Sequence, residues 1–369
     1  MADFQANWNR PFPRIVHPVT STPLPEDTDI ICLVPGTDIL LLSTAGSVIC
    51  WNAKLATKFP LPAVEFNHFI LEVSPPWETS GIYSIAFLTG DNVAPVAHIH
   101  IITITHEAGE ALILTSVFSE IPVPHVHHLK SVFLGEEMVG TISVGSNQED
   151  CIVSLCPWTA TGSNFHPDST RAFKIPGNFS NHPAAACFVF EDHLYHLIEN
   201  GQSVQIHHIS RTSLLSGKEG EQSTLCTSDI PGDFRSSWGM VPTTLLYGVS
   251  AVFVRSTDTK TRITFVPNAL THEVSSPLAF DVPCVSLIVE GNCDLMWLDH
   301  SGFNAALVVH KPPAAYNLLL VRYHSDTQST SLHELKVPEA IDLSNMKELC
   351  VDDSAGTIRL VNKEGLFST

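Results

Sequence analysis

The chain has 369 residues, of which 44% are hydrophobic and only 15% are charged. A chain of this composition can bury a large core, which argues against intrinsic disorder. Its formal net charge is −19 with histidine neutral, and no cluster of lysine or arginine appears in it. Nucleic acids and anionic membrane surfaces both require a concentrated basic surface, so the charge argues against both kinds of partner. The acidity is instead compatible with a protein partner whose surface is basic or neutral.

The distribution of proline and glycine predicts an all-β fold. Twenty-five prolines and twenty glycines are spread along the whole chain and leave few windows long enough for a regular helix. The low charged fraction also suits strands better than helices, whose exposed faces usually carry Glu, Lys and Arg. In chain order, residues 1–27 are rich in Pro, Asn and Thr and read as an extended arm, with an edge strand expected at 14–19. Residues 28–369 are predicted to form one domain.

A hairpin unit recurs along this domain: an apolar strand, a short turn containing glycine, and a second apolar strand. Four clear copies span residues 40–51, 193–204, 296–302 and 348–360, and three weaker turns lie near residues 108, 147 and 258. The seven turns are about 52 residues apart on average, close to the ~40–50 residues of a four-stranded propeller blade. The pattern predicts a β-propeller of seven blades, with six blades, or two separate β-sandwiches, as alternatives.

Closure of the predicted ring is expected at the two ends of the chain. A propeller avoids long exposed sheet edges by joining its first and last strands. The amino-terminal segment 14–19 and the carboxy-terminal segment 365–367 are both apolar enough to pair in this way.

The cysteines indicate a reducing compartment. Their number is odd, their spacing is irregular and most lie within apolar runs, which favours buried reduced thiols over disulfides. No amino-terminal signal peptide or membrane-spanning run is visible, so a cytoplasmic or nuclear location is expected. The nine are Cys32, Cys50, Cys151, Cys156, Cys187, Cys226, Cys284, Cys293 and Cys350.

Paired histidines are the candidate metal ligands. His98 and His100 alternate in a predicted strand and share one face, and His125 and His127 repeat the pattern. A cupin-type site would also need an acid three or four residues after His100, where Thr103, Ile104 and Thr105 stand. Solvated histidines on a blade face are therefore the favoured interpretation, with no metal and no cofactor expected.

Catalytic motifs are not recognisable in the sequence. His106-Glu107 and His272-Glu273 lack the second histidine that a zinc-protease helix requires four residues after the first. No nucleophile elbow, phosphate-binding loop or dinucleotide fingerprint is present. The sequence predicts that the chain is not an enzyme.

Tryptophans are the candidate partner-binding residues, because Trp is enriched in binding hot spots. Trp51 and Trp297 lie at strand positions and are expected to pack between blades. Trp77 and Trp238 lie next to Pro, Ser and Gly, so we expect them in loops, where a rigid scaffold tends to carry its binding function.

The two ends of the chain resemble the propeller-like region of the fungal (basidiomycete, mushroom-type) F-box protein family. The likeness rests on a Pro35-Gly36 turn, a hydrophobic strand and Gly46-Ser47-Val48 followed by Trp51-Asn52, and on the closing segment 348–367. Such proteins carry a helical F-box that docks on a Skp1-type adaptor of a ubiquitin ligase, and that helix is not seen in this sequence. The WD40 type is also similar, although Asn52 replaces its usual Asp.

Two functions follow as hypotheses. The first is a protein-interaction scaffold, which the resemblance implies would be the substrate-recognition part of an F-box-type ubiquitin ligase subunit. The alternative is a propeller enzyme, a hydrolase or lyase, with its site at the mouth of the central channel. The alternative requires His and carboxylate side chains that converge around the channel.

Overall fold

The computed structural model consists of strands joined by turns. Its one helical element among the described residues is a 3₁₀ turn, η3 (Leu343–Asn345). No helix in this part of the chain is long and apolar enough to cross a bilayer. The structure describes residues 15–20, 24–34, 37–44, 47–55, 57–58, 64–66, 69–74, 77–79, 82–90, 96–106, 112–122, 127–135, 138–145, 150–158, 171–176, 186–190, 193–200, 203–210, 223–229, 236–240, 249–267, 285–298, 302–352 and 356–369.

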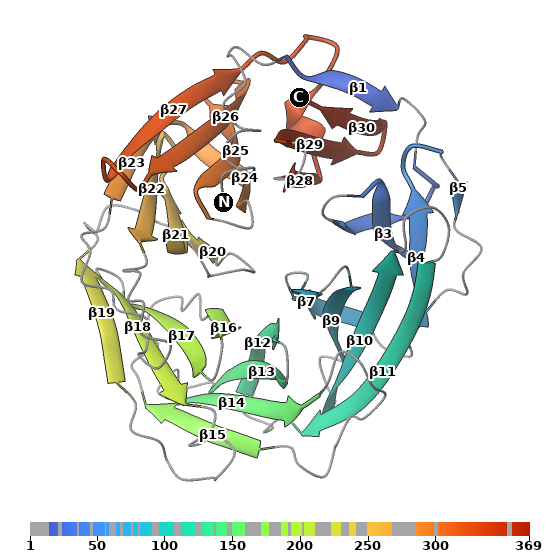
Figure 1. Cartoon of the computed structure of the whole chain (residues 1–369), viewed down its shortest axis with the longest axis vertical. Coiled ribbons are helices and arrows are strands. Elements are labelled where there is room, and N and C mark those ends of the chain that lie inside the picture. Colours follow the sequence, from blue (N-terminus) through green and yellow to red (C-terminus); the bar gives the residue numbers. More distant parts are fainter. Residues whose placement is uncertain are drawn as a thin grey trace. The chain divides into compact units, whose positions relative to one another are not determined.

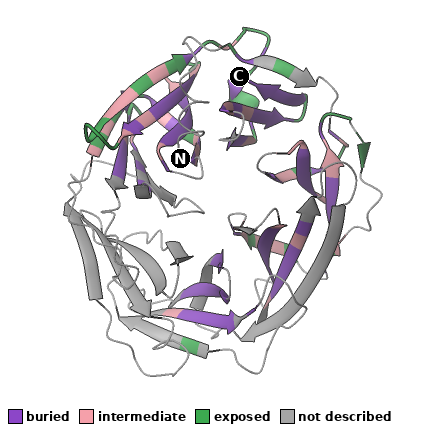
Figure 2. Cartoon of the chain, in the orientation of Figure 1, coloured by how far each residue is buried: buried purple, intermediate pink, exposed green. Residues whose placement is uncertain are grey.

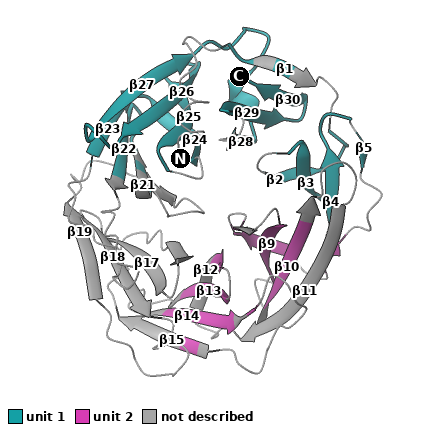
Figure 3. Ribbon diagram, in the orientation of Figure 1, with its two compact units in different colours: residues 1–63, 233–369 teal, residues 64–232 magenta. Residues whose placement is uncertain are grey.

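Within these ranges the strands form seven antiparallel sheets, and the prediction of an all-β fold is confirmed. The chain divides into two compact units, residues 1–63 with 233–369 (unit 1) and residues 64–232 (unit 2) (Figure 3). Unit 1 holds four of the sheets and unit 2 holds three. In most of the sheets, consecutive strands of the chain lie side by side as a meander, which is the arrangement predicted for propeller blades.

The sheets of unit 1 are labelled in Figure 1. Their strands are β1 (His17–Thr20), β28 (Glu348–Asp352), β29 (Thr357–Asn362) and β30 (Gly365–Ser368); β2 (Asp29–Leu33), β3 (Ile39–Thr44), β4 (Ser47–Asn52) and β5 (Thr57–Lys58); β20 (Ser236–Met240), β21 (Val249–Ser256), β22 (Lys260–Pro267) and β23 (Val285–Glu290); and β24 (Asn292–Leu298), β25 (Asn304–Lys311), β26 (Ala315–His324) and β27 (Ser329–Leu335).

The strands of unit 2 follow the same pattern. They are β7 (Phe69–Val73), β8 (Trp77–Thr79), β9 (Ile82–Gly90), β10 (Val96–His106) and β11 (Leu112–Pro122); β12 (His127–Leu134), β13 (Met138–Gly145), β14 (Asp150–Pro157) and β15 (Arg171–Pro176); and β16 (Ala186–Phe190), β17 (His193–Asn200), β18 (Ser203–Ser210) and β19 (Ser223–Asp229). The two-residue strand β6 (Val64–Glu65) belongs to none of these three sheets.

Each predicted hairpin turn joins two paired strands, and each sheet contains one of them. The seven hairpins are β3–β4, β10–β11, β13–β14, β17–β18, β21–β22, β24–β25 and β28–β29. Their uneven spacing has a structural cause, because the recognised hairpin takes a different place in different sheets. The β24–β25 turn joins the first two strands of its sheet, whereas the β10–β11 turn joins the last two.

The amino-terminal strand completes the sheet made by the end of the chain. β1 pairs antiparallel with β30, with His17 opposite Ser368 and Pro18 opposite Phe367. Just before β1, the Val16 amide donates a hydrogen bond of 2.9 Å to the carbonyl of Lys336. The predicted pairing of the two chain ends is therefore confirmed.

The hydrophobic core lies between the sheets rather than on one side of each. Strands such as β3, β9 and β25 contain runs of consecutive buried residues, which Figure 2 shows in purple. In unit 1, one core packs β25–β27 against β28–β30, and another packs β2–β4 against β28–β30. A strand covered on both faces has no need of alternating polar residues, which explains the continuous apolar runs in the sequence.

Candidate functional site

Trp77, a predicted partner-binding residue, lies in a strand and not in a loop. It begins β8 and stands opposite Ser84 of β9. Its half-buried ring packs against a core of unit 2 that contains Ala86, Leu88 and Trp158. The prediction of a loop was wrong. Pro75 and Pro76 indicated a turn in the sequence, but Trp77–Thr79 pairs with β9 as a strand, in line with the strand preference of aromatic residues. Trp77 thus has a packing role, and its part in partner binding stays a prediction.

Trp238, the second candidate, also lies in a strand. It is in the middle of β20, opposite Val254 of β21. The prediction of a loop was wrong here too, since the flanking serines and Gly239 are accommodated within the ladder. Its side chain is outside the described part of the structure, so its role in partner binding stays a prediction.

The two tryptophans expected to pack between sheets do so. Trp51 of β4 and Trp297 of β24 are both half-buried, and both lie against the core shared by β2–β4 and β28–β30. Trp297 also packs against the core between β25–β27 and β28–β30. The prediction is confirmed for these two residues.

His98 and His100 are both in β10, as predicted, but His100 is not solvated. It is only 7% exposed, and its ring lies edge-on to Phe66, with 4.5 Å between ring centroids and an interplanar angle of 66°. The expectation of a solvated blade face was wrong for His100, because β10 lies between β9 and β11 and its faces are covered by core residues. His98 is half-buried in the same strand.

The second histidine pair is only partly within the described structure. His127 begins β12, its side chain is not among those described, and His125 lies outside the described residues. In the ranges that the structure describes, no three His, Cys, Asp or Glu side chains are grouped so as to hold a metal ion.

Five of the nine cysteines have described side chains, and all five are buried free thiols, as predicted. They are Cys32, Cys50, Cys156, Cys293 and Cys350. Burial raises the pKa of the Cys50 thiol to about 12. Burial also raises the pKa of the Cys293 thiol to about 12. The nearby Asp294 carboxylate raises this pKa further, whereas a hydrogen bond with the Leu295 backbone lowers it. Thiols with such pKa values stay protonated at neutral pH and are poor nucleophiles.

A partly buried carboxyl group accompanies these thiols at the seam between β2 and β28 in unit 1. Burial raises the pKa of Glu348, the first residue of β28, to about 8. The pKa of the Cys32 thiol on β2 is raised well above its usual range, first by its own burial and then by Glu348, Cys350 and Cys50. At neutral pH the Glu348 carboxyl and the Cys32 and Cys50 thiols are therefore mainly neutral, which lets two strands pack closely without a buried charge.

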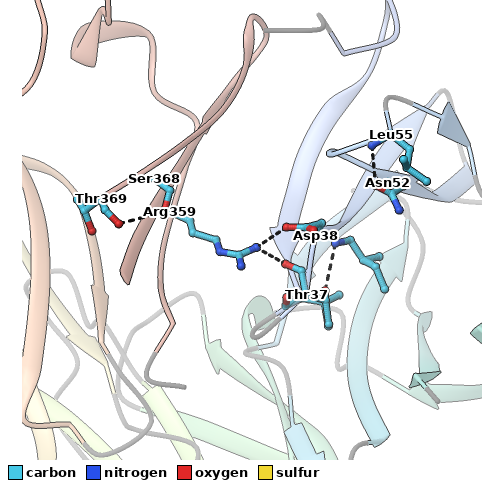
Figure 4. A network of polar contacts seen from close by, with 9 residues as sticks. Thr37, Asp38, Asn52, Leu55, Arg359, Ser368 and Thr369 are labelled. Atoms are coloured by element: carbon cyan, nitrogen blue, oxygen red, sulfur yellow. Dashed lines mark hydrogen bonds and ion pairs between the residues drawn. The ribbon is translucent and has the colours of Figure 1, made fainter. Parts of the chain in front are cut away.

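An ion pair crosses the same seam (Figure 4). Arg359 of β29 donates from Nη1 to Asp38 Oδ1 at 2.8 Å and to the Thr37 carbonyl oxygen at 2.6 Å. The Arg359 and Asp38 side chains are 18% and 31% exposed. The sequence carried no signal for this contact, because Arg359 and Asp38 are 321 positions apart.

Exposed aliphatic side chains form a feature that the sequence reasoning missed. Two of those in unit 1 lie on the outer strands of their sheets: Leu332 on β27 is 43% exposed and Ile288 on β23 is 49% exposed. A third, Leu55, follows β4 in a turn and is 67% exposed. Strand alternation would have placed Leu332 on the face opposite the buried Leu335, had the limits of β27 been known.

Comparison with known proteins is informative only at the level of structure. No protein-family model matches the chain, and no curated protein matches it. The chain is similar to the amino-terminal domain of Nup170 from Chaetomium thermophilum, solved as a complex with Nup53, with a TM-score of 0.50 and 11% sequence identity. That match covers 100% of this chain and 66% of the other.

Two further similarities have lower scores. The β-propeller domain of Nup133 from Vanderwaltozyma polyspora matches with a TM-score of 0.49 and 11% identity over 96% of both chains. Prolyl endopeptidases match with a TM-score of 0.46 and 11% identity over 87% of this chain, which spans only 44% of their length. Together with the meander sheets and the pairing of β1 with β30, the Nup170 similarity assigns this chain the β-propeller fold.

Proposed function

We propose that this chain is a protein-interaction scaffold. The observation that carries the proposal is the propeller fold, in which cores between the sheets cover the strand faces and leave loops and outer strand edges available for recognition. The similar Nup170 domain was solved in complex with a protein, Nup53. The acidic balance of the chain, −19, further favours a partner with a basic or neutral surface.

A finer form of the proposal comes from the sequence. The motifs at residues 35–52 and 348–367 resemble the propeller-like region of fungal F-box proteins. On that basis the scaffold would present substrates to a ubiquitin ligase, with a Skp1-type adaptor as the second partner. The propeller enzyme stays a prediction: in the described ranges no observation favours it over the scaffold.

Binding of purified proteins tests both levels. The tagged full chain is used to capture partners from fungal lysate after mild cross-linking, and each captured protein is then purified and titrated against the chain by calorimetry. A saturable complex of fixed stoichiometry is expected. Absence of any such complex with every purified candidate would contradict the scaffold proposal.

The adaptor is tested separately, by titrating a purified Skp1-type adaptor against the same chain. Saturable binding would support the ligase form of the proposal. If another protein binds and the adaptor does not, the chain is a scaffold without adaptor docking, and the F-box form of the proposal is wrong.

A further inference from the structure

Phe69 is the most exposed large hydrophobic side chain in the part of the chain that the structure describes. It is 79% exposed and begins β7, which pairs with β9 in unit 2 (Figure 1). Gly90, which stands opposite Phe69 on β9, has no side chain that could cover the ring. Aromatic side chains are enriched in protein interfaces, so a ring left open to solvent in a strand is a candidate contact residue.

A carboxylate lies on the same face of the sheet as this ring. Phe69 is opposite Gly90, and the register then shifts at Leu71, so that Glu72 is opposite Leu88. Residues two apart in β9 point to one face, and residues opposite each other in an antiparallel pair share a face. Phe69 and Glu72 are therefore neighbours on one face of the sheet.

The Glu72 carboxylate has no partner of its own among the described residues. Neither a hydrogen bond nor an ion pair of this side chain is present there. Burial by neighbouring protein atoms raises the pKa of Glu72, and no cation or hydrogen-bond donor in the described ranges offsets that effect. A partly desolvated carboxylate beside an exposed aromatic ring thus lacks the cation that would stabilise it.

The backbone that carries these two side chains is held in place. Just after β7, the Ser74 amide donates to the Ala86 carbonyl at 2.8 Å, and the Ala86 amide donates to Ser74 Oγ at 2.9 Å. Leu71 packs against the core of unit 2 that contains Ala86. The positions of Phe69 and Glu72 are therefore set before a partner arrives, which reduces the entropy lost on binding.

An arginine side chain fits this arrangement better than a metal ion or a lysine. Its guanidinium group is planar, stacks on aromatic rings and forms two parallel hydrogen bonds with a carboxylate, whereas an ammonium group does not stack. A metal ion would need more ligands, and no three His, Cys, Asp or Glu side chains of the described structure are grouped so as to hold one. The net charge of −19 also favours approach of a basic segment.

We propose that Phe69 and Glu72 form a recognition site for an arginine side chain of a partner protein, with the guanidinium stacked on the Phe69 ring and hydrogen-bonded to the Glu72 carboxylate. The inference rests on the proposed scaffold function and names a surface and the partner residue that it selects. A single cation–π contact in water is weak, so the site contributes specificity more than affinity.

The probe is the peptide Gly-Arg-Gly-Arg-Gly, and its matched control carries citrulline, an uncharged isostere, at both arginine positions. The full chain is produced with para-fluorophenylalanine at its 19 phenylalanine positions and observed by fluorine NMR. The Phe69 signal is the one that is missing from Phe69→Leu. The other variants are Glu72→Gln and, as a control at an exposed acid of unit 1, Glu339→Gln.

The arginine peptide should shift the Phe69 signal saturably, and the citrulline peptide should leave it in place. Glu72→Gln should weaken this binding about two- to fivefold, as expected for the loss of one exposed ion pair, and Glu339→Gln should leave it unchanged. Phe69→Leu should weaken the binding of a purified protein partner about fivefold or more. Because both side chains are exposed, the variants should unfold at the same temperature as the unaltered chain.

Several results would overturn the proposal. They are no shift of the Phe69 signal at tens of millimolar peptide, equal shifts with the arginine and citrulline peptides, and equal weakening by Glu72→Gln and Glu339→Gln. A dimer that Phe69→Leu dissociates would mean that a second copy of the chain covers the ring instead. If a purified partner binds Phe69→Leu and Glu72→Gln as tightly as the unaltered chain, the arginine site is wrong while the scaffold function stands.

Discussion

Glu348 shows how one residue can make the stability of the chain depend on pH. It begins β28 at the seam with β2, where burial raises its pKa from 4.5 to about 8. Below pH 4.5 the carboxyl is protonated in both the folded and the unfolded state. Between pH 4.5 and 8 the unfolded chain loses this proton while the folded chain retains it, so stability falls as pH rises and the full cost is present above pH 8.

Glu348→Gln is therefore expected to stabilise the protein at alkaline pH. Near pH 4 the variant and the unaltered chain should have the same free energy of unfolding. At about pH 9 that of the variant should be higher by on the order of 2–3 kcal/mol, a figure that is reduced to allow for the partial exposure of the side chain. Urea unfolding followed by tryptophan fluorescence across this range measures the difference. Glu339→Gln, at an exposed position, serves as the control. An equal pH dependence of the unaltered chain and Glu348→Gln would contradict the assignment.

Gly291 is a second residue whose replacement has a clear cost. It joins β23 to β24 with φ at +109°, and a Cβ atom there would lie 2.5 Å from Val309 Cγ1 and 2.6 Å from the His310 carbonyl oxygen. Gly291→Ala should lower the free energy of unfolding by about 2–4 kcal/mol, through backbone strain and crowding together. Gly302→Ala, at φ +70° in the left-handed helical region, should cost only about 1 kcal/mol. Equal losses in the two variants would show that the Gly291 turn and β25, which holds Val309 and His310, shift apart to relieve the crowding.

Among the elements, the loop between β2 and β3 is tied to β29 by a charged contact. Arg359 donates to both the Asp38 carboxylate and the Thr37 carbonyl, and both acceptors lie just before β3. Because the guanidinium is mostly buried, the loss of its partners should be larger than for an exposed surface pair.

Arg359→Met should therefore cost about 1–3 kcal/mol of unfolding free energy, and Asp38→Asn should cost less, because the Thr37 carbonyl bond and an amide oxygen remain. Chemical denaturation of both single variants and the double variant gives the coupling energy, expected at about 1 kcal/mol. Strictly additive losses would mean that the side chains act independently, against the geometry of Figure 4.

How well the elements could be predicted depended on the range of the interactions that define them. The β3–β4 and β28–β29 hairpins were predictable because two apolar runs and a glycine turn are local features. Trp77 and Trp238 were misplaced because Pro and Gly beside them read as loop signals, while pairing with β9 and β21 holds them in strands. The Arg359–Asp38 contact and the burial of His100 could not be predicted, since both arise from packing between distant parts of the chain.

At the scale of the whole molecule, the fold depends on strands from opposite ends of the sequence. β1 is the outer strand of a sheet whose other strands, β28–β30, end the chain. Val16, just before β1, is fully buried in the core that packs this sheet against β25–β27. The pairing was predictable because a propeller has to cover its last edge, although the register, with Pro18 opposite Phe367, was not.

A chain truncated before Pro25 should accordingly lose stability and gain a tendency to associate. Without β1 the β30 edge is left exposed, and the core loses Val16, whose removal alone should cost about 1–3 kcal/mol. A synthetic peptide of residues 15–20 should restore part of the lost stability when added in excess, because it can occupy the vacant edge. Thermal unfolding with and without the peptide, and with a scrambled peptide as control, measures the effect, and sedimentation follows association. If the truncated chain unfolds at the same temperature as the full chain, or if the scrambled peptide rescues it equally, the β1–β30 pairing contributes nothing to holding the two ends of the molecule together.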